Sequence, residues 1–218
     1  MMMMCVCVVR YNRQVDVVCR GFSGYNSRWA LDVLRGLLTP THTLTHSHTH
    51  TDTYSMATIF FGANDAVTSD DLQHCPLDEY RSNITSMVEA LRVHSPTIHI
   101  ILITPGTVDH SLWPTRSEDQ VAQYASVVRE VGVALNVPVA DLWSGAFALD
   151  KSVDFSDGLH LSTSGNEKVY NVVMSVINEY FKDSIPECTH YPAWRELAGR
   201  PASDTRAIID QWQWEESK

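Results

Sequence analysis

Apolar residues along this chain gather either in short continuous runs or in stretches where they recur every three or four positions. The short runs are rich in Val and Ile and predict β-strands at residues 15–19, 56–61, 98–104 and 137–143. Two of these runs, 56–61 and 98–104, are almost continuously apolar, which is typical of strands covered on both faces.

The stretches with helical spacing lie between and after these runs. They predict amphipathic helices at residues 27–38, 77–94, 117–135 and 164–182. Strands that alternate with helices form a parallel sheet, because each helical crossover returns the chain to the same end of the sheet. The pattern therefore predicts an α/β fold in which a parallel sheet lies between layers of helices.

Two segments do not fit this alternation. Residues 41–54 repeat Thr and His with no apolar period, and we interpret them as a low-complexity insert, disordered and exposed, within a domain spanning residues 1–185. Residues 186–218 hold Pro, Trp and charged side chains without a clear period, and we interpret them as a C-terminal tail packed on that domain.

The histidines of the insert leave a metal-binding interpretation open: they are His42, His46, His48 and His50. We favour a translated repeat without function, because alternating Thr and His is what a CA-dinucleotide repeat encodes in one frame. Adventitious binding of zinc or nickel to such a run of imidazoles would be unsurprising.

Composition argues against several classes of partner. The 218 residues carry 26 acidic and 16 basic side chains, a formal net charge of −10, which argues against a nucleic-acid-binding or polybasic membrane-binding protein. No apolar run reaches the ~18 residues of a transmembrane helix, and the apolar N-terminal run lacks the basic start of a signal peptide. The cysteines are odd in number and scattered, so we expect free thiols and a reducing, cytoplasmic location: they are Cys5, Cys7, Cys19, Cys75 and Cys188.

Polar motifs lie next to the predicted strands. The stretch "RGFSGYNSRWA" (20–30) follows the first strand, "GANDAV" (62–67) follows the second, and "SDGLHLS" (156–162) precedes the last helix. Ligands of open parallel sheets bind outside the carboxyl ends of the strands. We therefore expect the three motifs to meet at that edge.

Each motif has a chemical interpretation and a plainer one. Gly24 and Asn64 can offer two N–H donors to an oxyanion, and His160 can act as a general base oriented by Asp157. Alternatively, the glycine serves a turn, Asn64-Asp65 forms a turn or helix cap, and Asp-x-x-His is a surface turn. The order of the three motifs at strand ends favours the chemical interpretation.

In that order, "CRGFSGYNSRWA" (19–30), "TIFFGANDA" (58–66) and "SDGLHLSTSGNE" (156–167) resemble the conserved blocks of the SGNH (GDSL-type) hydrolases. The resemblance is closest to their isoamyl-acetate-hydrolysing esterase branch, and Cys19 stands where that branch usually has Asn. The resemblance implies a flavodoxin-like α/β/α sandwich and hydrolysis of small-molecule esters without a metal or other cofactor. It also implies that Gly24 and Asn64 form the oxyanion hole and that Asp157 and His160 form the catalytic dyad.

The nucleophile that the resemblance implies is missing from the sequence. Family members carry it as the serine of a Gly-Asp-Ser turn after the first strand, and Gly-Asp-Ser occurs nowhere in the 218 residues. Asp183-Ser184 lacks the glycine, and Ser23 belongs to the block of Gly24, so neither is favoured as the nucleophile.

The strand before that turn is missing as well. Five residues, 10–14, separate the N-terminal apolar run from residues 15–19, whereas a parallel crossover needs about a dozen. A flavodoxin-like order places the first strand in the centre, so its absence leaves two unpaired edges. We therefore expect an N-terminally truncated domain of an ester hydrolase, inactive as written. The alternative is an inactive binding protein that keeps the pocket without the chemistry.

Overall fold

The structure, a computed structural model, describes residues 17–38, 54–184 and 204. Its contacts divide the chain into a compact unit, Gly21–Tyr180, and a second unit made of Met1–Arg20 and Phe181–Lys218. Nearly all of the predicted insert and tail lies outside the described residues. The fold below is that of the compact unit.

A three-stranded parallel sheet lies at the centre of this unit, with β1 (Met56–Phe60), β2 (His99–Ile103) and β3 (Val139–Ala140) in that spatial order. Three of the four predicted strands are thereby confirmed. The third is much shorter than predicted, because the ladder ends at Asp141, whose carboxylate accepts the N–H groups of Trp143 and Ser144.

The four predicted helices are confirmed to within two residues at each end. They are α2 (Ser27–Leu37), α3 (Leu77–His94), α4 (Glu118–Leu135) and α5 (Thr163–Tyr180). A short 3-10 turn, η2 (Gly145–Phe147), completes the described elements of the compact unit, and another, η3 (Lys182–Ser184), belongs to the second unit. None of the described helices has the length and apolar character needed to span a bilayer.

Side-chain caps explain where two of the helices begin. The Asn26 side chain accepts the N–H of Trp29 at 3.0 Å at the start of α2. At the start of α4, Ser117 and Gln120 form a reciprocal capping box. Such caps satisfy N–H groups that have no partner inside the helix.

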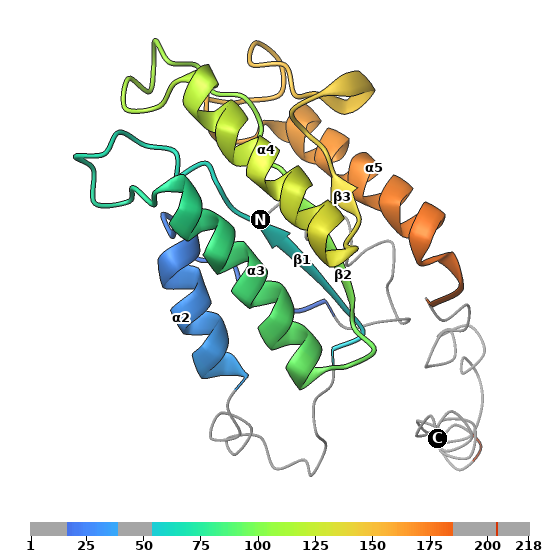
Figure 1. Ribbon diagram of the computed structural model, residues 1–218. Helices are drawn as coiled ribbons and strands as arrows, with labels where there is room; N and C mark the ends of the chain where they lie inside the picture. The colour runs from blue at the N-terminus through green and yellow to red at the C-terminus, as the bar shows by residue number, and fades with distance from the viewer. Residues whose placement is uncertain (1–16, 39–53, 185–203, 205–218) are drawn as a thin grey trace. The chain divides into compact units, whose positions relative to one another are not determined.

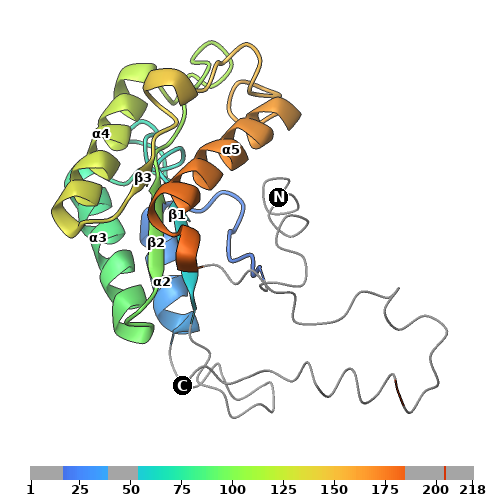
Figure 2. The ribbon, with the colours of Figure 1, turned by 90° about the vertical axis from the view of Figure 1, so that its right-hand side faces the viewer.

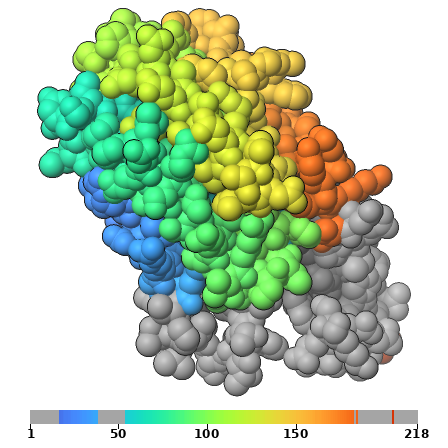
Figure 3. Space-filling view, viewed as in Figure 1, coloured from blue at the N-terminus to red at the C-terminus, as the bar shows by residue number. Residues whose placement is uncertain are grey.

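Helices cover both faces of the sheet. Figures 1 and 2 show α2, α3 and α4 side by side on one face and α5 on the other, and α5 packs against β3. The outer sides of α2, α3 and α4 form one continuous surface in Figure 3. This is the predicted α/β/α arrangement.

The core connects the helices to the loop that follows β1. The ring of Tyr80 in α3 lies 5.0 Å from that of Tyr124 in α4, in an edge-to-face contact. The Tyr80 hydroxyl donates to the carbonyl of Phe61 at 3.0 Å, and the Tyr124 hydroxyl donates to that of Cys75 at 2.6 Å. Both phenols thus fix the backbone of a loop that carries candidate site residues.

One predicted strand is wrong in its described part: residues 17–19 form no strand. An extended segment becomes a strand only where a neighbour pairs with its backbone groups, and no described strand pairs with these residues. Within the described chain β1 is an edge strand, bonded to β2 alone, and its Phe60 is 37% exposed.

Two helical glycines offer a matched test of the packing. A Cβ on Gly132 of α4 would lie 2.3 Å from Val139 Cγ2 and 2.9 Å from the carbonyl oxygen of Val137, whereas one on Gly36 of α2 would meet nothing within 4 Å. We expect Gly132→Ala to lower the free energy of unfolding by about 1–3 kcal/mol. Gly36→Ala should raise it by up to about 1 kcal/mol. Urea unfolding measures both, and effects of the same sign would contradict this packing.

Candidate active site

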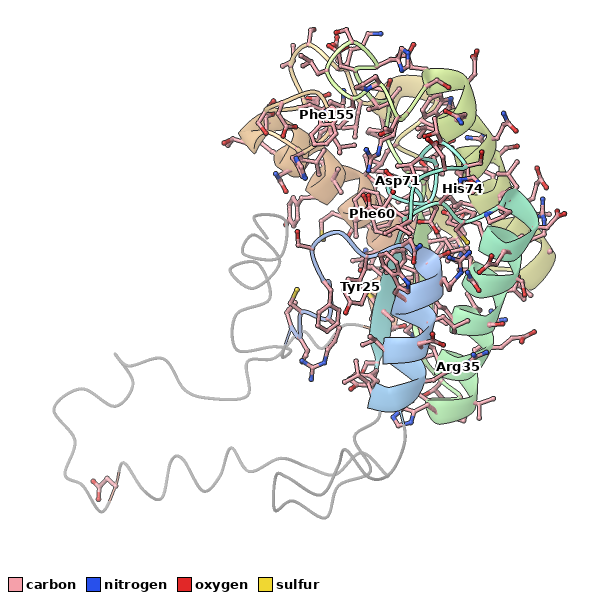
Figure 4. All side chains as sticks on the ribbon, turned by 90° about the vertical axis from the view of Figure 1, so that its left-hand side faces the viewer. Tyr25, Arg35, Phe60, Asp71, His74 and Phe155 are labelled. Carbon is pink, nitrogen blue, oxygen red and sulfur yellow. The ribbon has the colours of Figure 1, made fainter. Side chains whose placement is uncertain are left out.

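The strands are parallel, so the loops after them all leave from the carboxyl edge of the sheet, in the upper half of Figure 1. Figure 4 shows Asp71 and His74, from the loop after β1, beyond the end of the strand that carries Phe60. The motifs at residues 20–30, 62–67 and 156–162 were predicted to meet at this edge.

Asp157 and His160 form a hydrogen-bonded pair. The Nδ1 atom of His160 lies 2.7 Å from Oδ2 of Asp157, and Oδ1 of the same carboxylate accepts the backbone N–H groups of His160 at 2.8 Å and Leu159 at 3.0 Å. These bonds, led by the backbone N–H of His160, lower the pKa of Asp157 to about 2. The carboxylate therefore stays ionised at neutral pH.

Only Nδ1 of the imidazole is engaged by a described residue. The side chain of His160 is 67% exposed, and its Nε2 atom has no hydrogen-bonding partner in the part of the chain that the structure describes. A neutral ring whose Nδ1–H is held by a carboxylate presents Nε2 as a proton acceptor. This is the geometry of a general base with its orienting acid.

A neighbouring loop holds the turn that carries this pair. Gly158 has φ +84°, and a Cβ there would lie 2.7 Å from Cβ of Asp109, whose N–H donates to the Gly158 carbonyl at 2.8 Å. The indole N–H of Trp113 donates to the carbonyl of Asp157 at 2.9 Å, and its ring meets that of His160 edge-on at 5.8 Å. Close packing and the left-handed backbone together explain glycine at position 158.

The other two candidates are joined through the backbone. Gly24, with φ +77°, accepts the side-chain amide N–H of Gln73 at its carbonyl (2.7 Å), and the Asn64 amide donates to the carbonyl of Tyr25 at 2.9 Å. Within the described residues, neither the N–H of Gly24 nor the second amide hydrogen of Asn64 has an acceptor. As far as the described residues go, both can donate to a ligand oxygen.

Asp65, rather than Asn64, fills the structural role in the Asn64-Asp65 pair. Its buried carboxylate accepts the N–H of Ser27 at 2.8 Å and that of Gly62 at 3.1 Å, which ties the loop to the start of α2. Burial raises the pKa of Asp65. Asn64 caps none of the described helices. It lies in the turn at residues 63–66, and its side chain bonds the Tyr25 carbonyl and Arg116.

Sequence reasoning missed the residues that connect the two halves of the site. Arg116, from the loop before α4, donates from Nη2 to Oδ1 of Asn64 at 3.1 Å, and its Cζ lies 5.4 Å from the centre of the Trp113 ring. Gln73, which also bonds Arg116, was missed as well. Trp113 was missed too. No short motif marks Arg116, Gln73 or Trp113, because these side chains act only through contacts between loops.

Ser23 is not brought to the base. It lies exposed in the turn with Gly24, and no hydrogen bond joins it to His160 among the described residues. The structure thus gives no support to Ser23 as a nucleophile.

Two surface hollows lie near the start of α4. They have volumes of about 370 and 610 Å³ and share Glu118, Asp119 and Lys151 in their walls. The Lys151 ammonium lies 3.0 Å from the Glu118 carboxylate. Neither Asp157 nor His160 is among the residues that line these two hollows.

Two of the cysteines can be compared with the prediction of free thiols. Cys19 is free and exposed, and Cys75 is free and buried. Burial raises the pKa of the Cys75 thiol to about 11, so it stays protonated at neutral pH. The prediction is confirmed for these two residues.

Comparison with known proteins identifies the family of the chain. The GDSL-like Lipase/Acylhydrolase family matches residues 6–168. The human isoamyl acetate-hydrolyzing esterase 1 homolog is 36% identical over 87% of this chain and 78% of its own length. An Arabidopsis thaliana GDSL esterase/lipase, At5g45920, is 34% identical over 77% and 74%. The crystal structure of the lipase/acylhydrolase from Enterococcus faecalis superposes with a TM-score of 0.56 at 25% identity, covering 76% of this chain and 74% of that one.

Fold and relatives together define the class of this protein, an ester hydrolase with an α/β/α sandwich. The chain belongs to the GDSL-like lipase/acylhydrolase family.

Proposed function

We propose that this chain supplies the base, its orienting carboxylate and two oxyanion donors for the hydrolysis of small acyl esters by a Ser-His-Asp mechanism. The observation that carries the proposal is the bond between His160 Nδ1 and Asp157 Oδ2, with Nε2 unpartnered in the described chain. The serine is not among the 218 residues, since Gly-Asp-Ser does not occur in them.

The steps follow from the groups present. The serine hydroxyl attacks the ester carbonyl carbon as His160 Nε2 takes its proton, and the resulting oxyanion accepts the N–H of Gly24 and the amide of Asn64. Asp157 stabilises the imidazolium. The tetrahedral intermediate collapses to an acyl-serine as His160 returns the proton to the departing alcohol, and a water activated by His160 then releases the acid.

Apolar side chains flank the proposed donors and base. Leu112 is 61% exposed and packs against the turn at Gly158, and Phe22, two residues before Gly24, is 48% exposed. Such side chains favour the alkyl parts of a small ester. We extend the proposal to small apolar esters as substrates, in line with the isoamyl acetate that names the human relative.

The proposal places this reaction in the cytoplasm. Its supports are the free thiols of Cys19 and Cys75, which suit a reducing compartment. The net charge of −10 disfavours nucleic acid as a partner, which leaves a small-molecule substrate.

The first test uses the 218-residue chain itself. Because the serine is absent, we expect the chain to hydrolyse p-nitrophenyl acetate no faster than its Asn64→Ala, His160→Ala double variant. EDTA should leave the rate unchanged, since no step of the mechanism uses a metal. Turnover that disappears in His160→Ala would contradict this expectation and would make Ser23 the leading nucleophile.

The second test supplies the missing group. We define the chimera as this chain with residues 41–54 removed and the first strand and Gly-Asp-Ser turn of a GDSL-like relative placed ahead of Cys5. The chimera is expected to hydrolyse the ester, and its Ser→Ala control is not. If the chimera unfolds cooperatively yet matches its control, the esterase proposal fails and the binding-protein alternative replaces it.

A further inference from the structure

Arg116 is a buried cation that forms no ion pair in the described part of the chain. Arg116 is only 4% exposed. None of the ion pairs among the described residues includes it. Burial lowers its pKa and the nearby charge of Asp71 opposes that shift, and a guanidinium remains charged in proteins. Burying a charge is costly unless its donors are used, so the contacts of this group should show why it is there.

Four neutral oxygen atoms accept hydrogen bonds from the guanidinium of Arg116. Nε donates to the carbonyl of Ala63 at 2.8 Å, Nη1 to the Thr115 hydroxyl at 3.2 Å, and Nη2 to Asn64 Oδ1 at 3.1 Å and Gln73 Oε1 at 3.3 Å. Two of these oxygens belong to side-chain amides that could otherwise point either way.

The contact with Asn64 fixes the polarity of that amide. A guanidinium has only donors, so the oxygen of Asn64 must face Arg116 and its nitrogen must face away. The nitrogen then donates one hydrogen to Tyr25 and keeps the other for a ligand. The Tyr25 carbonyl, which can only accept, favours the same orientation, so removal of Arg116 takes away one of the two contacts that set it. A rotated amide would present its oxygen to an oxyanion and repel it.

The contact with Gln73 acts on the other donor in the same way. With its oxygen turned to Arg116, the amide nitrogen of Gln73 donates to the carbonyl of Gly24 at 2.7 Å. The same residue's backbone carbonyl accepts the Asn26 amide at 2.8 Å. The turn that presents the N–H of Gly24 is therefore held through Arg116.

The face of the guanidinium touches the dyad side of the site. Cζ of Arg116 lies 5.4 Å from the centre of the Trp113 ring, within cation–π range. Trp113 in turn meets the His160 ring edge-on at 5.8 Å and donates to the carbonyl of Asp157. Arg116 thus contacts Asn64 directly. Through Gln73 it reaches Gly24, and through Trp113 it reaches Asp157 and His160.

We propose that Arg116 is a positioning residue that sets the amide polarity of Asn64 and Gln73 and holds Trp113 against His160. The proposal rests on the proposed roles of Gly24, Asn64 and His160. Its geometry can nevertheless be tested without turnover, in the 218-residue chain.

The test is nuclear magnetic resonance on the isotope-labelled full chain. In Arg116→Ala we expect the Asn64 side-chain amide signals to shift and broaden, because both amide orientations become populated, and the His160 ring signals to shift as Trp113 is released. Methylguanidinium should restore both sets of signals, whereas methylammonium at the same ionic strength should not, since a single ammonium cannot bond the separate acceptors. Arg81→Ala, which removes an exposed arginine paired with Glu130, is the control and should leave both sets unchanged.

Further variants separate the outcomes. Trp113→Phe should move the His160 signals and leave those of Asn64, because it removes the bond to Asp157 and not the guanidinium. If Arg116→Ala does not fold, Arg116→Lys decides, since it keeps the charge and the stem but not the planar fork. Wild-type signals for Asn64 and His160 in a folded variant, or equal restoration by methylammonium, would overturn the proposal. An inactive chimera with normal signals would instead refute the proposed function alone.

Discussion

In the chimera, replacing His160 by alanine is expected to lower the turnover number roughly 10⁴–10⁶-fold, because the serine then has no base to take its proton. Asp157→Asn should cost about 10⁴-fold, since the carboxylate orients the ring and stabilises its cation. His74→Ala is the matched control. His74 also lies in a loop with Nδ1 engaged, but its partner is the carbonyl of Val67 at 2.7 Å, so its loss should change turnover little. Ester hydrolysis under single-turnover and steady-state conditions measures all three variants.

The pH profile provides an independent check of the same pair. Folding lowers the pKa of Asp157 from 3.8 to about 2, so the stabilisation from this pair is present above pH 3.8 and is lost as the pH falls through 2. Above pH 4 the carboxylate is already ionised, and turnover should rise with pH only as the imidazole loses its proton. A second ionisation between pH 4 and 6 that disappears in Asp157→Asn would contradict this assignment.

The second large effect is expected at Asn64. Asn64→Ala in the chimera should lower the turnover number on the order of 10²–10³-fold with little change in KM, because the lost N–H acts on the oxyanion and not on the ground-state ester. Asn83→Ala is the control, since its amide donates at 3.0 Å to the Ser27 hydroxyl in the core. It should lower the free energy of unfolding and leave the turnover number of the folded enzyme within a few-fold.

A double variant links this result to the positioning role of Arg116. If Arg116 acts on the oxyanion through Asn64, Arg116→Ala combined with Asn64→Ala should cost much less than the product of the two single effects. Multiplying effects would show that the two side chains act independently. A rise in KM alone for Asn64→Ala would show that the amide binds the ester and not the oxyanion.

The periodicity of apolar residues was enough to predict the class of fold. The spacing within residues 77–94 and 117–135 is that of helices with one buried face, and both helices form with ends within one residue of the prediction. The apolar run 98–104 predicted a strand covered on both faces, and Ile101, Leu102 and Ile103 of β2 are almost wholly buried. Such signals are local, since they depend on one element and the side of it that faces the core.

Residues 15–19 show where local pattern fails. Their composition suits a strand, yet residues 17–19 form none, because a strand depends on hydrogen bonds from a neighbour that the local sequence does not contain. The length of β3 has the same cause. After β3 the backbone N–H groups bond side chains and not a neighbouring strand: that of Leu142 bonds Thr104, and those of Trp143 and Ser144 bond Asp141.

In the candidate site, too, the local sequence determined some features and the tertiary structure determined others. Asp157 and His160 lie three residues apart, so the turn "SDGLHLS" by itself determined that a carboxylate and an imidazole could meet, and they do so at 2.7 Å. Gly24 and Asn64 could be singled out as possible donors from their motifs. Only the tertiary structure decided that Arg116, Gln73 and Trp113 connect these groups, because side chains from separate loops meet only after the strands have brought those loops to one edge of the sheet.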